Sequence, residues 1–304
     1  MMSLQSRFVF SMARPLAAVA ALSAILVSGC SHSIDLDDLR GLPVSANPSE
    51  LTVVGFNLES GDAAPAYLAQ EYLAQMPGVD LWGLSEVQDR SWLPVLEQGA
   101  ESGEGLDYDT VLGTTGGGDR LAIIYNTALL ELIAVEELEE LSFAGRVRAP
   151  LIARFQLRDT PYQFLFMVNH LYRSDVEKRH QQARKLNQWG RSQQMPVVAV
   201  GDYNFDFDVA KGDGGQRDPG FDLMTDAGVF TWVRPQPLAM TYCSDRYNSI
   251  LDFIFVANGA TRWPVTATTV PYADRIDYCP DTAVKSDHFP VMATFDLTNM
   301  IGGP

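Results

Sequence analysis

The chain has 304 residues, of which 46% are hydrophobic and 20% are charged, so it can bury a sizeable core and is neither disordered nor fibrous. Lysine and arginine together number 22 against 38 aspartate and glutamate residues, which gives a formal net charge of −16 at pH 7. Tight non-specific binding to a polyanion is therefore disfavoured, because it depends on basic side chains that neutralise phosphates. A local basic cleft is compatible with this charge.

The first thirty residues have the composition of a secretory signal. Arg7 and Arg14 are the only charged residues there, and the apolar run 15–27 follows them. That run is too short for a membrane span, which needs about 20 residues. A basic start, a short apolar centre and small residues before a cleavage site are typical of a signal peptide. An uncleaved anchor is the alternative.

The segment Val27-Ser28-Gly29-Cys30 resembles the lipobox of bacterial lipoproteins, in which the cysteine is acylated and becomes the first mature residue. An ordinary signal peptide is the alternative interpretation. Cleavage before Cys30 would remove two arginines and no acidic residue, so the charge would change from −16 to −18. Ser31, rather than an aspartate, follows Cys30, and the resemblance then favours the outer membrane over the inner one. The protein is thus expected in the bacterial cell envelope, with the membrane as a partner through its lipid.

Four segments are expected along the chain. They are a lipoprotein signal peptide at 1–29, a tether at 30–49, one folded domain at 50–298 and a tail at 299–304. The tether lacks hydrophobic periodicity and contains two prolines. No protein partner is predicted.

The domain mixes strand-like and helical patterns. Strands rich in Val, Ile and Phe are expected at 51–56, 121–125, 151–157, 163–168, 196–200, 250–256 and 291–295. Helices are expected at 64–76 and 175–193, and exposed glycine-rich loops at 113–118 and 211–220. Hairpin-like strands mixed with crossover helices favour sheets flanked by helices.

Cys243 and Cys279 remain once Cys30 is set aside. In an oxidising compartment an even pair of cysteines is readily bridged, so we expect a disulfide between them. Two buried free thiols are the alternative.

Polar side chains follow several strand-like runs, where a rigid sheet can hold reactive groups. Asp202 and Asn204 come after the run 196–200, and in an extended segment they share a face while Tyr203 points away. An aspartate can orient or deprotonate water, and an amide can hold an oxyanion. A simple turn is the alternative, because Asp, Asn and Gly are common in turns.

Two histidines are candidates for chemistry. His288 follows Asp287 just before the strand 291–295, and His170 lies at the end of another strand. An Asp-His pair at a strand entrance can contact a metal or a phosphate and act as a general acid or base. A capping aspartate beside a surface histidine is the alternative for the pair, and a structural role is the alternative for His170.

Three further polar residues complete the candidates. Asp252 interrupts an apolar run, where a carboxylate is costly unless it is paired, and His288 is a natural partner. Asn57 ends the strand 51–56, and Glu86 follows an apolar run. A cap and a solvated charge are the respective alternatives for Asn57 and Glu86.

Taken together, these residues resemble the endonuclease/exonuclease/phosphatase family, which includes deoxyribonuclease I and bacterial sphingomyelinases. Six motifs stand in order across residues 51–296: Phe56-Asn57, Ser85-Glu86, Asn169-His170-Leu171, Gly201-Asp202-Tyr203-Asn204, Leu251-Asp252-Phe253-Ile254 and Ser286-Asp287-His288-Phe289-Pro290. Six ordered motifs are far more specific than any one of them. The resemblance implies an α+β fold, a four-layered αββα sandwich.

The resemblance also implies roles for the residues. Glu86, helped by Asn57 and with Asp287 as a further candidate, would bind a divalent cation. Asp202 would orient or deprotonate the attacking water, and Asn204 would hold the phosphate. His170 and His288 would donate hydrogen bonds or a proton, and Asp252 would brace His288.

The donor set is consistent with this assignment, since oxygen ligands without cysteine select Mg²⁺, Mn²⁺ or Ca²⁺ over zinc. Arg120 and Arg148 are weaker candidates for phosphate contacts, with plain surface charges as the alternative. The expected activity is metal-assisted in-line attack of water on a phosphoester, by an extracytoplasmic endonuclease or phosphodiesterase.

Other functions stay open. A small-molecule phosphatase and a sphingomyelinase-like phospholipid hydrolase are the enzymatic alternatives, and a catalytically silent lipoprotein binding module is the non-enzymatic one. The acidic composition weighs against a tight grip on nucleic acid, and no apolar loop for membrane contact stands out.

Overall fold

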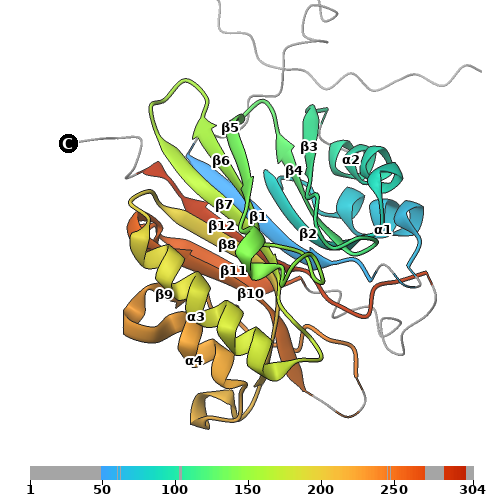
Figure 1. Ribbon diagram of the computed structural model, residues 1–304. Coiled ribbons are helices and arrows are strands. Elements are labelled where there is room, and N and C mark those ends of the chain that lie inside the picture. The colour runs from blue at the N-terminus through green and yellow to red at the C-terminus, as the bar shows by residue number, and fades with distance from the viewer. Residues whose placement is uncertain are drawn as a thin grey trace, which may run out of the picture. The chain divides into compact units, whose positions relative to one another are not determined.

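The computed structural model describes residues 49–298, except 60, 62, 103–104, 245, 247 and 271–283. Two six-stranded sheets pack face to face, and helices cover the outer face of each sheet (Figure 1). The expected four-layered αββα sandwich is confirmed.

Each sheet is mixed. The first has the order β11 (Val265–Thr269), β12 (Val291–Asp296), β1 (Glu50–Asn57), β2 (Leu81–Val87), β4 (Arg120–Asn126) and β3 (Tyr108–Leu112). The second has the order β5 (Leu130–Glu137), β6 (Leu151–Leu157), β7 (Gln163–His170), β8 (Val197–Asp208), β10 (Ser249–Ala257) and β9 (Phe230–Trp232). Near the centre of each sheet one pair is parallel, β1 with β2 and β7 with β8.

The helices are short except for one. They are α1 (Pro65–Glu71), α2 (Leu93–Glu101), α3 (Val176–Ser192) and α4 (Pro219–Thr225). Short 3-10 helices lie at Leu73–Gln75, Arg90–Trp92, Glu139–Leu141, Gly212–Gly214, Asp226–Gly228 and Asn258–Arg262. Helix α3 begins after Asp175, whose carboxylate accepts a hydrogen bond from Lys178 N at 3.1 Å and so caps the helix. None of the described helices is long and apolar enough to cross a bilayer.

Three apolar cores hold the layers together. Phe155, Phe166 and Val200 lie in the core between the sheets, which is built from the inward side chains of both. The other two cores lie between each sheet and its helices, one containing Trp82 and the other Phe255. Because the central strands are buried on both faces, their sequences are nearly continuous apolar runs.

The sheets approach closely beneath the ends of the two parallel pairs. A Cβ added at Gly83 of β2 would lie 2.2 Å from Val200 Cγ2 of β8, so only glycine fits there without movement. This close approach places the carboxyl ends of β1 and β2 beside those of β7 and β8. Side chains that follow these strands can therefore meet across the two sheets.

Most expected elements are present. The strand 151–157 is β6, and the helix 175–193 is α3 to within a residue at each end. The helix 64–76 ends earlier, because α1 stops at Glu71 and a separate 3-10 turn follows. The strand 196–200 continues as β8 to Asp208. Strands β2, β3, β5, β9 and β11 and helices α2 and α4 were not expected.

The segment 211–220 is only partly an exposed loop. It contains the 3-10 turn Gly212–Gly214 and the first residues of α4. Gly212 and Gly220 are buried because each packs against a phenylalanine ring, Phe207 and Phe205 respectively. These two glycines allow close packing rather than loop flexibility. The prediction of an exposed loop from the glycine content of 211–220 was therefore only partly right.

Candidate active site

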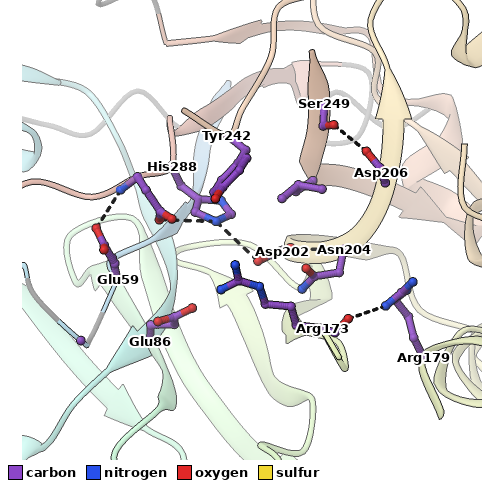
Figure 2. Close-up of a pocket in the computed structure, with 13 residues that line it drawn as sticks. Glu59, Glu86, Arg173, Arg179, Asp202, Asn204, Asp206, Tyr242, Ser249 and His288 are labelled. Atoms are coloured by element: carbon purple, nitrogen blue, oxygen red, sulfur yellow. Dashed lines mark hydrogen bonds and ion pairs between the residues drawn. The ribbon is translucent and has the colours of Figure 1, made fainter. Parts of the chain in front are cut away.

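A pocket of about 490 Å³ opens where β1, β2, β7 and β8 end (Figure 2). Its lining is mostly polar and comes from both sheets and from the loops after them. The lining residues are Glu59, Gly61, Glu86, Arg173, Arg179, Asp202, Asn204, Asp206, Tyr242, Ser249, Leu251, Asp287 and His288.

Glu86 reaches the pocket because β2 carries a bulge. Leu84 pairs with Ala122 and Val87 with Arg120, so β2 has one more residue than β4 between these pairs. Glu86 is one of the two residues in the bulge, with φ at 59°, a left-handed conformation that is uncommon for a residue with a side chain. Such local strain is found where a fold directs a functional side chain.

Asn57 links the two sheets at this point. Its Nδ2 donates to Glu86 Oε1 at 3.0 Å and to Asp202 Oδ2 at 3.1 Å. Its Oδ1 accepts a hydrogen bond from Glu59 N at 3.0 Å. Asn57 thus orients both carboxylates, and its oxygen has a second lone pair beyond the one that Glu59 N uses.

Asp202 and Asn204 both line the pocket, but β8 is not a regular strand there. Asp202 pairs with Asp252 and Phe207 with Ile250, so β8 carries three extra residues between these pairs. Asn204 lies within that bulge at φ 54°, and its N–H donates to Asp202 Oδ1 at 2.8 Å. Tyr203 is fully buried in the outer core. The expected orientation is present, but a bulge and a local turn produce it.

His288 and Asp252 form a buried pair. His288 Nδ1 lies 2.7 Å from Asp252 Oδ2, and the two residues are 5% and 1% exposed. Ser286 Oγ fixes the loop, because it donates to Asn57 O at 2.6 Å and accepts from His288 N at 3.0 Å. The other ring nitrogen, Nε2, lies 3.8 Å from Asp202 Oδ2 and 3.7 Å from Asp287 Oδ1.

These neighbours set the charge of the pair. Burial alone would lower the pKa of His288, but the charge and hydrogen bond of Asp252, with Asp202 and Asp287 beyond, raise it to about 10. Burial raises the pKa of Asp252 to about 6, against the opposing effect of His288. At neutral pH His288 is therefore protonated and Asp252 ionised.

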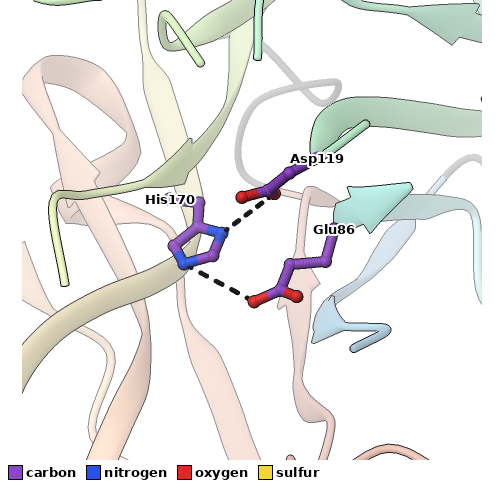
Figure 3. A group of neighbouring side chains, drawn as sticks. All are labelled: Glu86, Asp119 and His170. Atoms are coloured by element: carbon purple, nitrogen blue, oxygen red, sulfur yellow. Dashed lines mark ion pairs between the residues drawn. The ribbon is translucent and has the colours of Figure 1, made fainter. Parts of the chain in front are cut away.

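His170 lies between two carboxylates, as Figure 3 shows. Its Nε2 is 3.8 Å from Glu86 Oε1 and 3.4 Å from Asp202 Oδ2, and its Nδ1 is 3.7 Å from Asp119 Oδ1. Asp119 also pairs with Arg148, whose Nη1 lies 2.6 Å from Asp119 Oδ2. Burial would raise the pKa of Asp119, but His170 and Arg148 outweigh it and lower that pKa.

Two groups of side chains in the described part of the chain have ligand atoms close enough to share a cation. One is Glu86, Asp119 and His170, and the other is Asp202, Asp252 and His288. The first group fits better, because two of its atoms, Asp119 Oδ1 and His170 Nδ1, are buried without a hydrogen-bond partner, against one in the second group, Asp252 Oδ1. In the second group, His288 Nδ1 and Asp252 Oδ2 already bind each other. A carboxylate-rich set suits Mg²⁺ or Mn²⁺. Asp287 lines the pocket together with Glu86.

Arg120 and Arg148 do not line this pocket, and their expected contact with phosphate stays a prediction. Arg120 Nε donates to Gly117 O at 2.8 Å. Arg148 is 9% exposed and lies behind Asp119. Cys30 and Cys279 lie outside the described residues, so the lipid attachment and the Cys243–Cys279 disulfide stay predictions.

The sequence analysis missed several residues of the site. Arg173, Glu59 and Tyr242 line the pocket from loops, and Asp119 contacts His170 from the loop before β4. Arg173 and Glu59 had a usable signal, since they follow the strand-end residues His170 and Asn57 by three and two residues. The others belong to no strand-end motif.

Comparisons with known proteins agree with this geometry. A model of the Endonuclease/Exonuclease/phosphatase family matches residues 54–288. No curated protein gives a significant match.

Solved structures share the fold. A Bacteroides thetaiotaomicron protein of the same family is 19% identical with a TM-score of 0.58, over 81% of this chain and 94% of that one. A mannosyl-6-phosphatase from the same species is 20% identical with a TM-score of 0.57, over 80% and 98%. D. rerio TDP2 in complex with a single-strand DNA product is 19% identical with a TM-score of 0.60, over 81% and 99%. At these identities the likeness concerns the fold.

Proposed function

The chain belongs to the endonuclease/exonuclease/phosphatase family of metal-dependent phosphoester hydrolases, and on this premise we propose that it hydrolyses compact phosphate esters in the bacterial cell envelope. The observation that carries the proposal is the junction at Asn57. Through this one amide, Glu86 of one sheet and Asp202 of the other face the same pocket, with His170 and His288 beside them.

The residues of the site can divide the reaction between them. A bound divalent cation would polarise the phosphoryl group and offset its charge. Asp202 is placed to orient a water molecule and to accept its proton, because Asn57 and the Asn204 N–H fix its carboxylate. His288, held protonated by Asp252, can donate to a phosphoryl oxygen or to the leaving group.

The composition of the pocket bears on the substrate. Its lining has five carboxylates and two guanidinium groups, and one of these, Arg179, is paired with Asp218 at 2.6 Å. The two arginines that were weaker candidates for phosphate contacts, Arg120 and Arg148, do not line the pocket. Few cations are thus available for a row of phosphates, which favours a compact ester over a polynucleotide.

A nuclease or phosphodiesterase is the second candidate. The sequence alone favoured this class, and D. rerio TDP2, which has the same fold, was solved with a single-strand DNA product. The location in the envelope rests on the signal-like first thirty residues and on the Val27-Ser28-Gly29-Cys30 segment.

The test is a substrate screen of the purified protein with Mg²⁺, Mn²⁺ or Ca²⁺, before and after chelation. It includes an aryl phosphomonoester, an aryl phosphodiester, single- and double-stranded DNA and phospholipid vesicles. Glu86→Gln and Asp202→Asn should each lower turnover by roughly 10³-fold or more, because charge stabilisation and water positioning are lost. Glu136→Gln, an exposed carboxylate on β5, is the control.

Two outcomes would contradict the proposal. Hydrolysis that persists after chelation, or in the Glu86→Gln protein, would mean that the site does not work through a cation at Glu86. Absence of turnover with every ester would favour the binding-module alternative.

A further inference from the structure

Arg173 is an exposed cationic side chain within the pocket. It follows His170 by three residues, in the segment between β7 and α3. Figure 2 shows its side chain pointing into the pocket, toward the side of Asp202 and His288. The roles assigned to the cation, Asp202 and His288 do not involve this side chain.

Hydrogen bonds hold the backbone at Arg173 close to β8, the strand that carries Asp202. Arg179 Nη1 donates to the carbonyl oxygens of Tyr172 and Arg173, each at 2.9 Å. Leu171 N donates to Asp202 O at 2.9 Å. The backbone that carries the Arg173 side chain is therefore fixed relative to Asp202.

The two pocket arginines differ in what their donors contact. Arg179 is 6% exposed, and its N–H groups donate to backbone carbonyls and to Asp218. It therefore stabilises the segment between β7 and α3. The Arg173 side chain makes no hydrogen bond or ion pair with any described residue, although it stands in an acidic pocket.

The carboxylates around Arg173 are held by other groups. Glu86 and Asp202 accept from Asn57, and Asp206 accepts from Ser249 Oγ at 2.5 Å. Glu59 Oε2 accepts from Asp287 N at 2.9 Å. A guanidinium left available beside such groups is suited to bind an anionic oxygen that a ligand brings, in the bidentate geometry that arginine favours.

We propose that Arg173 binds a non-bridging oxygen of the substrate and makes the pocket selective for phosphomonoesters over phosphodiesters, an inference that rests on the proposed function. A monoester has three non-bridging oxygens, and a diester has two. Asn204 and His288, which line the pocket, offer donors to two such oxygens, and Arg173 offers donors to the third.

A diester would bring an ester oxygen and its carbon group to Arg173 instead. The guanidinium would then lose water without gaining an anionic acceptor, which is unfavourable. A monoester also carries more negative charge near neutral pH, and this adds to the preference.

The test compares Arg173→Gln and Arg173→Lys with the wild type. The substrates are p-nitrophenyl phosphate and bis(p-nitrophenyl) phosphate, and binding of inorganic phosphate is measured by calorimetry. Arg184→Gln is the matched control, because Arg184 lies on α3 outside the pocket with a half-exposed side chain. All variants are checked by circular dichroism for an unchanged fold.

For Arg173→Gln we expect kcat/KM for the monoester to fall by about 10- to 150-fold, the range for one hydrogen bond to a charged group. The diester value should change little, and phosphate affinity should fall by a similar factor to the monoester value. Arg173→Lys should recover part of the loss, since it keeps the charge but not the fork.

Equal losses on both esters, or no loss on either, would overturn the inference. If the wild-type protein hydrolyses neither ester, the proposed function fails, and phosphate binding still decides the role of Arg173. In that case an unchanged affinity in Arg173→Gln would overturn it.

Discussion

The pair of His288 and Asp252 keeps two charges inside the protein next to the pocket. Asp252 N and Leu251 N both donate to Thr241 Oγ1, at 3.1 and 2.9 Å, so the backbone around the carboxylate is fixed. Burying an ion pair costs desolvation energy, and such pairs are weak contributors to stability. A reactive role for His288 therefore explains the pair better than stability does.

Replacing Asp252 by Asn should lower the pKa of His288 in the metal-free protein. The wild-type value is raised from 6.5 to about 10, so its stabilising effect is complete below pH 6.5 and is lost as the pH rises through 10. The free energy of unfolding of the wild type should therefore fall between pH 7 and 10, and that of Asp252→Asn should vary less. NMR titration of the His288 ring and urea unfolding across this range are the measurements.

Asp159→Asn, a change at an exposed turn, is the control for this titration. An unaltered His288 pKa in the Asp252→Asn protein would show that other carboxylates hold the charge.

Residues at strand ends were the predictable part of the site. Asp202, Asn204, Asp252 and His288 could be found because each interrupts, follows or precedes an apolar run. Asp119 could not be found in this way. It lies in the loop before β4 of the first sheet, whereas its contact His170 ends β7 of the second sheet. Long-range loop placement leaves no periodic trace in the sequence.

Departures from regular strand geometry direct several of the reactive side chains. The bulge in β2 contains Glu86, and the larger one in β8 contains Asn204 and begins after Asp202. Just before the β8 bulge, Gly201 has φ 136°, and a Cβ there would lie 1.9 Å from Asn169 O on β7. Gly201 therefore lets β7 and β8 stay paired where His170 and Asp202 lie side by side.

Gly201→Ala should destabilise the fold by about 2–4 kcal/mol, because it adds both backbone strain and a backbone clash. Urea unfolding followed by circular dichroism measures the change. Gly214→Ala is the control, since no atom lies within 4 Å of a Cβ there. Equal stability of the two variants would show that β7 and β8 can separate at little cost.

The elements differ in how well they could be predicted, for reasons of burial. β6 was predicted to the residue, since five of its seven residues are both apolar and buried. β5 was missed, because only Leu130 of its eight residues is buried and the strand shows no clear alternation. β2 was noted as an apolar run but not as a strand, since Gly83 interrupts it and only packing against Val200 explains that glycine.

At the scale of the whole molecule, six motifs spread over more than two hundred residues meet at one end of the sandwich. Their order along the chain indicated the family, and the fold supplies the reason they converge. The two parallel strand pairs, one in each sheet, end on the same side. The net charge of −16 is a property of the entire chain and did not predict that Arg173, among the described residues that line the pocket, is an arginine without a charged partner.

The lipid anchor is a prediction at this scale. Cys30→Ser should leave a precursor that a palmitate analogue does not label, because the acylated cysteine is absent. The precursor should hydrolyse a soluble phosphate ester as the wild type does, because the described residues that line the pocket all lie beyond Glu50. Equal labelling of the variant and the wild type would contradict the anchor.

The direction of β1 has a consequence for access. The strand begins at Glu50 and ends at Asn57, so the chain enters the domain at the end of the sheet remote from the pocket. The last described residues are at that same end, since Leu297 N donates to Ser49 O at 2.7 Å. Nineteen peptide units between Cys30 and Ser49 span at most about 65 Å. If Cys30 carries a lipid, the tether joins the domain at the end opposite to the pocket, which leaves the pocket open to dissolved esters.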